Sequence, residues 1–426
     1  MIDHVAIALR YGSPAYVYDL DRVRAARTDL ATALPESFEI FYAVKANPHP
    51  EILAELRSGE PGSGPGNGTR AEISSTGELA AVIAGGFDGA DILYTGPGKT
   101  EGEITEALAA GVRLFSVESL GDLRRIGRTA ERAGTVARAL LRINSATSSA
   151  STSIRMTGTP SQFGFDSETI PEIRAEILSV PGTSVLGAHF YSLSNARDEE
   201  SLVAELLHTI ECAATLRDQL GIEFELLDIG GGFASPYANT GTRPVYPNLR
   251  HALEGALDAH FSGWREGAPR IAVESGRYLV GDSGDLVTTV VNLKESRGKR
   301  FVVADAGINT FGGMSGLGRL LPVAVRARED GRPADQKASL VGPLCTPGDV
   351  LGRDIPLPAL EPDDIVVVPN AGAYGPTASL LMFLGRPAPV EVVVRGGEVV
   401  GASRLRHVRE DVLPAVSETS ESRASV

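Results

Sequence analysis

The sequence has few of the residues that mark disulfide-bonded, metal-binding or membrane-spanning proteins. Among 426 residues there are two cysteines, Cys212 and Cys345, too few for a disulfide framework or a cysteine metal cluster. No apolar run reaches the ~18 residues of a membrane-spanning helix, and no basic segment followed by an apolar one opens the sequence. We therefore expect a cytoplasmic protein with no membrane contact and no bound metal.

Positive charge is scarce as well, and it is carried unevenly by lysine and arginine. The chain has 54 Asp and Glu against 40 Lys and Arg, a net charge of −14, and a pI near 5.1. Such a surface repels phosphate backbones, so we expect no nucleic-acid partner. Only five of the basic residues are lysines, namely Lys45, Lys99, Lys294, Lys299 and Lys337.

Lys45 differs from the other lysines in its position. It ends the strand-like apolar run 41–44, and the breaker Asn47-Pro48 follows almost at once. Unlike arginine, a lysine whose pKa is lowered by its site can lose its proton and attack a carbonyl. We interpret Lys45 as a candidate Schiff-base lysine. The alternative is a lysine that only extends its amine to solvent from a strand end.

Short strand patterns alternate with amphipathic helix patterns across the first two thirds of the chain. The helix patterns include 77–84, 119–133 and 199–220. Eight such units predict an α/β fold, a (β/α)8 TIM barrel over residues 30–280, with a doubly wound open sheet as the structural alternative. The predicted strands are 38–44, 71–74, 91–95, 113–117, 139–143, 185–191, 225–229 and 270–274.

The carboxyl ends of these strands are unusually polar. In a (β/α)8 barrel the active site is built at these ends, which lie on one face. The residues at the predicted ends are Lys45, Ser75, Gly96, Glu118, Asn144, His189, Gly230, Gly231, Gly232, Glu274, Ser275, Gly276 and Arg277.

After residue 281 the pattern changes to strands and turns with little helix. The strand patterns are 286–292, 300–304, 338–341, 365–369 and 390–395. They predict a mainly antiparallel β-domain of residues 281–416, joined by residues 1–29 through a strand at 16–19. The Gly/Pro-rich segment 59–69 and the tail 417–426 have compositions typical of disorder.

Three consecutive glycines, Gly230, Gly231 and Gly232, follow the seventh predicted strand. Glycine backbones can approach an anion closely, and barrel phosphate sites typically lie after strands seven and eight. Gly276 and Arg277 follow the eighth strand. A triple glycine alone is more often a tight turn, but at this position it favours a phosphate site.

A phosphate site and a strand-end lysine in one barrel together indicate pyridoxal 5′-phosphate. This cofactor needs an amine for its aldehyde, a carboxylate for its pyridine nitrogen and a flat group against its ring. Lys45, Glu274 and His189 are the candidates. Singly, Glu274 could equally be a structural ion-pair partner and His189 a core histidine.

The ordered set of motifs resembles the fold-type III pyridoxal-phosphate decarboxylases, the diaminopimelate, ornithine and arginine decarboxylase family. The resemblance extends from about residue 13 to residue 405. Its landmarks are Tyr42-Ala43-Val44-Lys45-Ala46-Asn47, Ser75-Thr76-Gly77-Glu78-Leu79, Phe163-Gly164, His189, the three glycines from Gly230, Glu274-Ser275-Gly276-Arg277, Gly342-Pro343-Leu344-Cys345 with Asp349, and Gly372-Ala373-Tyr374-Gly375.

The resemblance implies a role for each matching residue. Lys45 would hold the cofactor, His189 would stack on its ring, and Glu274 would pair with the pyridine nitrogen. Cys345 would reach the other subunit's site and return a proton after CO2 leaves, which implies a homodimer. The implied phosphate contacts are Ser194, Gly230, Gly231, Gly232, Gly276 and Tyr374; the implied substrate contacts are Arg277, Thr346 and Asp349.

Two departures from the family pattern bear on the substrate. Thr346 follows Cys345 where diaminopimelate decarboxylases have a glutamate that reads the distal amino group, and Leu193 replaces a glycine before Ser194. Residues 153–164, 274–279 and 342–347 resemble the decarboxylase of butirosin biosynthesis, which acts on glutamate attached to an acyl carrier protein. We therefore expect a secondary-metabolism decarboxylase of an amino acid or amino-acid conjugate.

Three alternatives remain open from the sequence. One is an amino-acid racemase on the same barrel, which would need two bases on opposite faces of the ring. A second is a diaminopimelate-type decarboxylase of primary metabolism. The third is a pyridoxal-phosphate carrier protein, which would have the barrel alone, whereas this chain continues through residues 342–349 and 372–375.

Overall fold

The computed structural model describes residues 2–58, 68–145, 160–312 and 331–410. Most of the predicted disordered segment 59–69, the whole predicted tail 417–426 and residues 153–159 of the butirosin-like segment lie outside the described residues. Within the described part, no helix has both the length and the apolar character needed to cross a membrane.

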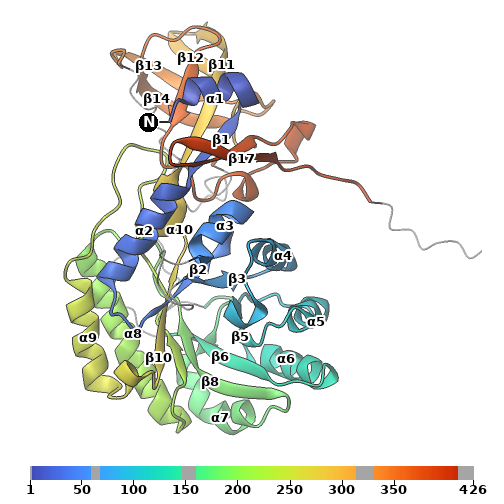
Figure 1. Ribbon diagram of the computed structural model, residues 1–426, viewed down its shortest axis with the longest axis vertical. Coiled ribbons are helices and arrows are strands. Elements are labelled where there is room, and N and C mark those ends of the chain that lie inside the picture. Colours follow the sequence, from blue (N-terminus) through green and yellow to red (C-terminus); the bar gives the residue numbers. More distant parts are fainter. Residues whose placement is uncertain (1, 59–67, 146–159, 313–330, 411–426) are drawn as a thin grey trace, which may run out of the picture.

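Eight parallel strands close into a barrel, as predicted. Each strand pairs with its neighbours, and pairing between β5 and β6 closes the ring. The helices that follow the strands surround it (Figure 1). The barrel strands are β2 (Glu39–Ala43), β3 (Arg70–Ile73), β4 (Ile92–Tyr94), β5 (Leu114–Val117), β6 (Ala137–Asn144), β8 (Thr183–Phe190), β9 (Leu226–Asp228) and β10 (Arg270–Ser275); β7 (Phe165–Asp166) adds a short pairing to β6.

Strand-end residues of the barrel also begin the helices that follow. The side chain of Ser75 accepts a hydrogen bond from the backbone N–H of Glu78, and Ser119 accepts one from Asp122. Such caps satisfy backbone donors that have no partner within the helix. The helices of this part are α2 (Leu20–Ala33), α3 (Pro50–Arg57), α4 (Thr76–Ala84), α5 (Glu101–Ala109), α6 (Leu120–Arg132), α7 (Ile170–Leu178), α8 (Glu199–Leu220), α9 (Leu249–His260) and α10 (Arg277–Val280).

The barrel interior changes from apolar to polar along the strands. One buried cluster fills its lower part: Phe41, Leu93, Leu114, Leu140, Leu186, Leu226 and Ala272. Because side chains alternate faces along a strand, inward-pointing residues recur one level higher, in most strands two positions further on. On β8 the pairing with β6 is irregular, so His189 lies three positions after Leu186. At that level the buried side chains are mostly polar and form what we call the polar layer: Glu72, Thr95, Ser116, Arg142, His189, Asp228 and Glu274.

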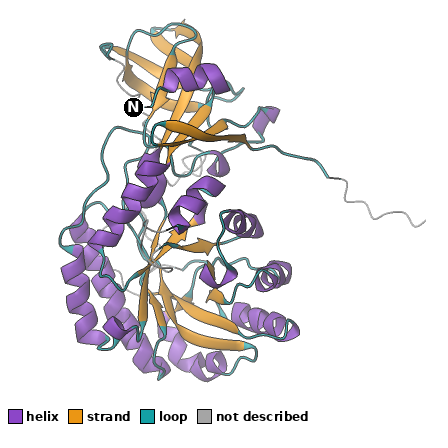
Figure 2. Cartoon of the chain, viewed as in Figure 1, coloured by secondary structure: helices purple, strands orange, loops and turns teal. Residues whose placement is uncertain are grey.

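The second sheet is mainly antiparallel and includes the N-terminal strand. Figure 2 shows it as a group of strands beyond the barrel. β1 lies in its middle, antiparallel to β11 and parallel to β16. Helix α1 and strands β14 and β17 were not predicted. The elements are α1 (His4–Tyr11), β1 (Ala15–Asp19), β11 (Gly284–Ser296), β12 (Lys299–Ala304), β13 (Gln336–Val341), β14 (Val350–Leu357), β15 (Ile365–Val368), β16 (Val390–Arg395) and β17 (Glu398–Arg404).

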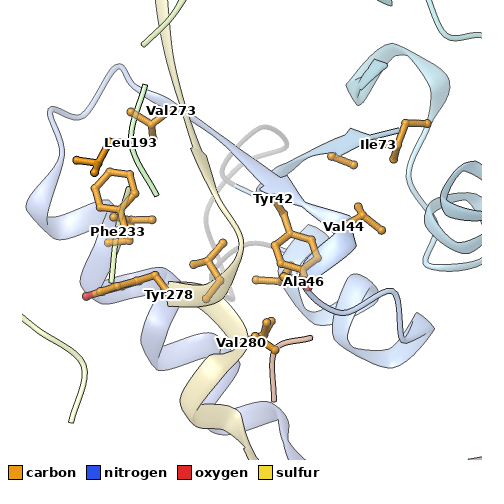
Figure 3. Close-up of a cluster of buried hydrophobic side chains, with 14 of the residues drawn as sticks. Tyr42, Val44, Ala46, Ile73, Leu193, Phe233, Val273, Tyr278 and Val280 are labelled. Atoms are coloured by element: carbon orange, nitrogen blue, oxygen red, sulfur yellow. The ribbon is translucent and has the colours of Figure 1, made fainter. Parts of the chain in front are cut away.

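The barrel and the second sheet share one continuous apolar core. Figure 3 shows Tyr42 of β2, and Val44 and Ala46 just after this strand, packed near Val280 of α10. Backbone contacts reinforce this junction: the N–H of Tyr374 donates to the carbonyl of Ala46 at 2.7 Å. A segment from beyond β15 is therefore fixed directly beside Lys45.

A buried carboxylic acid in the second sheet makes stability depend on pH. Glu391 on β16 accepts a hydrogen bond from the hydroxyl of Tyr18 at 3.1 Å. Burial raises the pKa of Glu391 to about 7, which the hydrogen bond from Tyr18 only partly opposes. Because the folded chain holds this proton more tightly than the unfolded chain, stability falls as pH rises from about 4.5 through about 7.

We predict that Glu391→Gln stabilises the protein at pH 8 and has little effect at pH 5. The amide stays neutral and keeps an oxygen for Tyr18, so the gain at pH 8 should be about 1–3 kcal/mol. Thermal and denaturant unfolding at both pH values measure it. The matched control is Glu398→Gln on exposed β17, for which no such pH-dependent difference is expected. An equal effect of Glu391→Gln at both pH values would contradict the prediction.

Candidate active site

A cavity opens at the carboxyl end of the barrel around Lys45, and we call it the Lys45 cavity. Seven of the predicted site residues line it: Lys45, Ser194, Gly232, Glu274, Gly276, Arg277 and Tyr374. The other lining residues are Ala43, Tyr191, Asn195, Phe233 and Ser275. The fold thus brings together residues from opposite ends of the chain, from Ala43 to Tyr374.

The amine of Lys45 is held between a carboxylate and an aromatic ring. Nζ lies 2.8 Å from Oε2 of Glu72 and 5.8 Å from the centre of the Tyr191 ring. Burial disfavours the charge, but the carboxylates of Glu72 and Glu274 outweigh it and raise the pKa of Lys45 above its usual value. The two carboxylates that face the amine therefore favour its protonated form in the free chain, and the amine must lose this proton before it can attack a carbonyl.

Glu274 and His189 form a buried pair inside the polar layer. Nε2 of His189 lies 3.1 Å from Oε1 of Glu274, and both side chains are almost fully buried. The other ring nitrogen, Nδ1, lies 2.7 Å from the hydroxyl of Ser116. His189 is not among the residues that line the Lys45 cavity. It lies deeper in the barrel, and its ring reaches the carboxylate of Glu274 instead.

The charges of this pair depend on each other. Burial opposes ionisation of Glu274, but His189, Lys45 and Arg142 outweigh it and lower its pKa. Burial opposes protonation of His189, but Glu274 and Asp228 raise its pKa. Burial and the nearby Glu274 raise the pKa of Asp228 to about 7. Glu274 is therefore the carboxylate of this cluster that is held ionised.

The three consecutive glycines are required by close backbone packing. A Cβ on Gly230 would lie 2.3 Å from the carbonyl oxygen of Phe190, and one on Gly231 would lie 2.2 Å from that of Glu274. Gly230 and Gly232 also have positive φ angles of 78° and 116°. Only glycine fits here, and the resulting loop leaves backbone, without side chains, at the edge of the cavity.

Arg277 is fixed by two tyrosine rings from distant segments. Its guanidinium lies 4.7 Å from the ring centre of Tyr374 and 5.1 Å from that of Tyr237. The hydroxyl of Tyr237 also donates to the carbonyl of Tyr374 at 3.3 Å. This arrangement holds one permanent positive charge beside the cavity, where a phosphate or carboxylate would be attracted.

The remaining predicted residues lie in the second sheet, outside the Lys45 cavity. Cys345 is exposed in the segment between β13 and β14. Asp349 is buried, and its carboxylate accepts backbone hydrogen bonds from Ile308 and Leu344 at 2.8 and 2.7 Å. Asp349 thus fixes the segment that carries Cys345 and Thr346. The substrate contacts expected of Thr346 and Asp349 stay predictions.

The residues present fit pyridoxal phosphate. Within the described residues, Oγ of Ser275 is buried without a hydrogen-bond partner, and Oε1 of Glu274, although 3.1 Å from Nε2 of His189, has no partner of good hydrogen-bond geometry. Buried polar atoms of this kind are rare unless a ligand satisfies them. A pyridine N–H would suit an ionised Glu274, the glycine loop and Arg277 would suit a phosphate, and Lys45 supplies the amine.

Several residues of the site were missed from the sequence. Glu72 occupies the interior of a short barrel strand, and an acidic residue between the apolar Ala71 and Ile73 of β3 was the available signal. Ser116 and Asp228 give a comparable signal, a polar residue in the otherwise apolar strands β5 and β9. Tyr191 was assigned only to a predicted strand end. Its contact with Lys45 depends on how that strand enters the barrel.

Comparisons with known proteins agree with this geometry. Residues 20–281, more than half of the chain, match the family described as pyridoxal-dependent decarboxylase, pyridoxal binding domain. The chain is 32% identical over 402 residues to the L-glutamyl-[BtrI acyl-carrier protein] decarboxylase of Niallia circulans, covering 92% of this chain and 91% of that protein.

Two further likenesses are to diaminopimelate decarboxylases. That of Methanothermobacter thermautotrophicus is 31% identical over 415 residues, covering 96% of this chain and 93% of that protein. The Helicobacter pylori enzyme, crystallised with L-lysine, superimposes with a TM-score of 0.79 at 26% identity, covering 93% and 95% of the two chains. The chain therefore belongs to the family of pyridoxal-dependent decarboxylases, and its cofactor is pyridoxal 5′-phosphate.

Proposed function

We propose that this enzyme removes the α-carboxyl group of an amino acid that carries a bulky or tethered group, as a step of secondary metabolism. The observation that carries the proposal is the identity of residue 346. Thr346 follows Cys345 where diaminopimelate decarboxylases have a glutamate that recognises the distal amino group of the substrate. The likeness to a decarboxylase of carrier-bound glutamate also supports a substrate with a bulky or tethered group.

The chain's own residues are suited to hold the reacting groups. When bound, pyridoxal phosphate supplies an electron-withdrawing ring that accepts the electrons left behind by CO2. Lys45 would bind the cofactor, and Glu72, 2.8 Å from its amine, orients it and can exchange a proton with it. Glu274 would keep the ring nitrogen protonated, because the neighbouring His189 keeps this carboxylate ionised.

Anionic groups would be held at the opposite side of the cavity. We assign the cofactor phosphate to Ser194, Gly276, Tyr374 and the loop Gly230, Gly231 and Gly232. Arg277, fixed between two tyrosine rings, would bind either this phosphate or the carboxylate of the substrate. No glutamate or aspartate besides Glu274 lines the cavity in the described part of the chain, so a distal ammonium group has no obvious partner there.

We further propose a homodimer in which Cys345 completes the partner's site. Within the described residues, the Lys45 cavity contains no thiol, whereas Cys345 is exposed on a segment fixed by Asp349. An exposed thiol on a fixed segment can reach a second subunit and donate a proton there. Thr346 would then lie beside the substrate of that subunit.

A diaminopimelate-type decarboxylase is the second candidate. Diaminopimelate decarboxylases match almost the whole chain at a similar identity. The racemase and carrier-protein alternatives are not supported, because the family is one of decarboxylases and the two relatives named above, both decarboxylases, align with over nine tenths of the chain.

We predict that CO2 is released from glutamate attached to an acyl carrier protein, or from another conjugated amino acid, faster than from any free amino acid. Trapping of labelled CO2 from free glutamate, lysine, ornithine and meso-diaminopimelate, set beside the carrier-bound forms, measures the preference. Efficient turnover of free meso-diaminopimelate would select the second candidate instead.

We predict that Lys45→Ala abolishes both decarboxylation and the absorbance at about 420 nm that pyridoxal phosphate gives when bound to a lysine. Lys294→Ala, on an exposed part of β11, is the matched control and should keep both. Persistence of the absorbance in Lys45→Ala would rule out Lys45 as the cofactor-binding amine.

Subunit mixing tests whether the sites are shared. We expect Cys345→Ala to bind cofactor normally but to turn over slowly, since only protonation is affected. Mixing it equally with inactive Lys45→Ala should restore about a quarter of wild-type activity, because half of the dimers then carry one intact site. Failure of the mixture to regain activity, with subunit exchange verified, would refute sharing of the site through Cys345.

A further inference from the structure

Two aromatic side chains near the end of β8, His189 and Tyr191, differ in their depth within the barrel. Residues two positions apart on a strand point to the same face, so both rings point inward at successive levels. His189 pairs in register with Arg142 and Asp228, within the polar layer. Tyr191 lies beyond the last residue of the strand, at the level of the Lys45 cavity, which it lines.

The surroundings of His189 leave its ring no access to the cavity. The side chain is 2% exposed, Nδ1 contacts the hydroxyl of Ser116, and Nε2 contacts Glu274. Nδ1 is thus hydrogen-bonded, and Nε2 is in ionic contact with Glu274 without good hydrogen-bond geometry, so both nitrogens face neighbours inside the barrel. Swinging this ring to the cavity would break both contacts and leave a buried carboxylate without its partner, which is costly.

Tyr191 has the contacts expected of a ring-binding side chain. Its ring centre lies 5.8 Å from Nζ of Lys45. The ring also packs above the glycine loop, since a Cβ built on Gly231 would lie 3.7 Å from its Cε2 atom. The amine and the glycine loop are the two groups that would hold opposite ends of the cofactor, and Tyr191 contacts both regions.

We propose that Tyr191, not His189, is the aromatic side chain that contacts the cofactor ring, and that His189 is a positioning residue beneath it that holds Glu274. The proposal rests on the proposed use of the Lys45 cavity for the cofactor. It replaces the stacking role that the sequence alone suggested for His189. An offset or tilted contact between two aromatic rings is favourable and needs no charge on either one.

The phenol also has the electrostatic character that this position requires. Burial raises the pKa of Tyr191 to about 12, although Lys45 opposes the shift, so the side chain stays neutral in the physiological range. A neutral ring adds no positive charge next to Lys45 and does not compete with it for Glu72 or Glu274. His189, below the cavity, contributes most to keeping Glu274 ionised, and Lys45 and Arg142 add to it.

The affinity of the cofactor-free protein for pyridoxal phosphate distinguishes the roles of Tyr191 and His189. Dissociation constants for pyridoxal phosphate are measured by equilibrium dialysis of wild type, Tyr191→Phe, Tyr191→His and Tyr191→Leu. The flat-ring variants should bind within about threefold of wild type, whereas Tyr191→Leu should bind about tenfold more weakly. Thermal unfolding without cofactor is the folding control, and Tyr191→Met takes the place of Tyr191→Leu if the latter does not fold.

His189→Gln tests the positioning role. The variant should bind cofactor within about threefold of wild type but shift the absorbance maximum of the bound cofactor, because the charge on Glu274 changes. A tenfold loss of affinity in His189→Gln together with an unchanged affinity in Tyr191→Leu would overturn the proposal. Lack of pyridoxal phosphate binding by the wild type would instead refute the assignment of the cavity.

Discussion

Ionised side chains buried inside the barrel are the constraint on which the rest of this structure depends. A carboxylate such as Glu274 is costly to bury unless a positive charge lies beside it. His189 meets that need at 3.1 Å, and Ser116 on β5 holds the other side of the histidine ring. Three strands, β5, β8 and β10, must therefore keep their relative register for one carboxylate to stay ionised.

The same requirement explains why the barrel changes character along its length. The lower cluster is apolar and holds the strands together without directional contacts. The side chains of the polar layer above it are instead held in specific ion pairs, including Glu72 with Lys45 and Arg142 with Glu118 at 3.0 Å. The lower cluster gives rigidity, and the paired charges above it aim the reactive groups at a single cavity.

The second sheet contributes to the site through its attachment to the barrel. Tyr374 reaches the cavity because its backbone binds that of Ala46, next to Lys45, and its ring packs on Arg277. Asp349 fixes the segment of Cys345 on a different part of the sheet, outside the cavity. One chain therefore holds a nearly complete cofactor site and an exposed thiol, an arrangement that suits the proposed pairing of two subunits.

Local sequence patterns determined the eight barrel strands, the mainly antiparallel second sheet, and the candidates Lys45, Glu274 and Arg277, because alternation and strand-end position are readable along the chain. Other elements were not readable. β14 contains Gly352 and Asp354, the latter with φ of 48°, and β17 is almost wholly exposed, so neither has a clear strand pattern. Tertiary structure alone decided the partners, since Glu72 meets Lys45 and Ser116 meets His189 only across neighbouring strands. It likewise decided that Tyr191, and not His189 two residues before it, lines the cavity. How deep a side chain lies in the barrel depends on how the strands close into a ring, and the spacing of residues along the sequence does not show this depth.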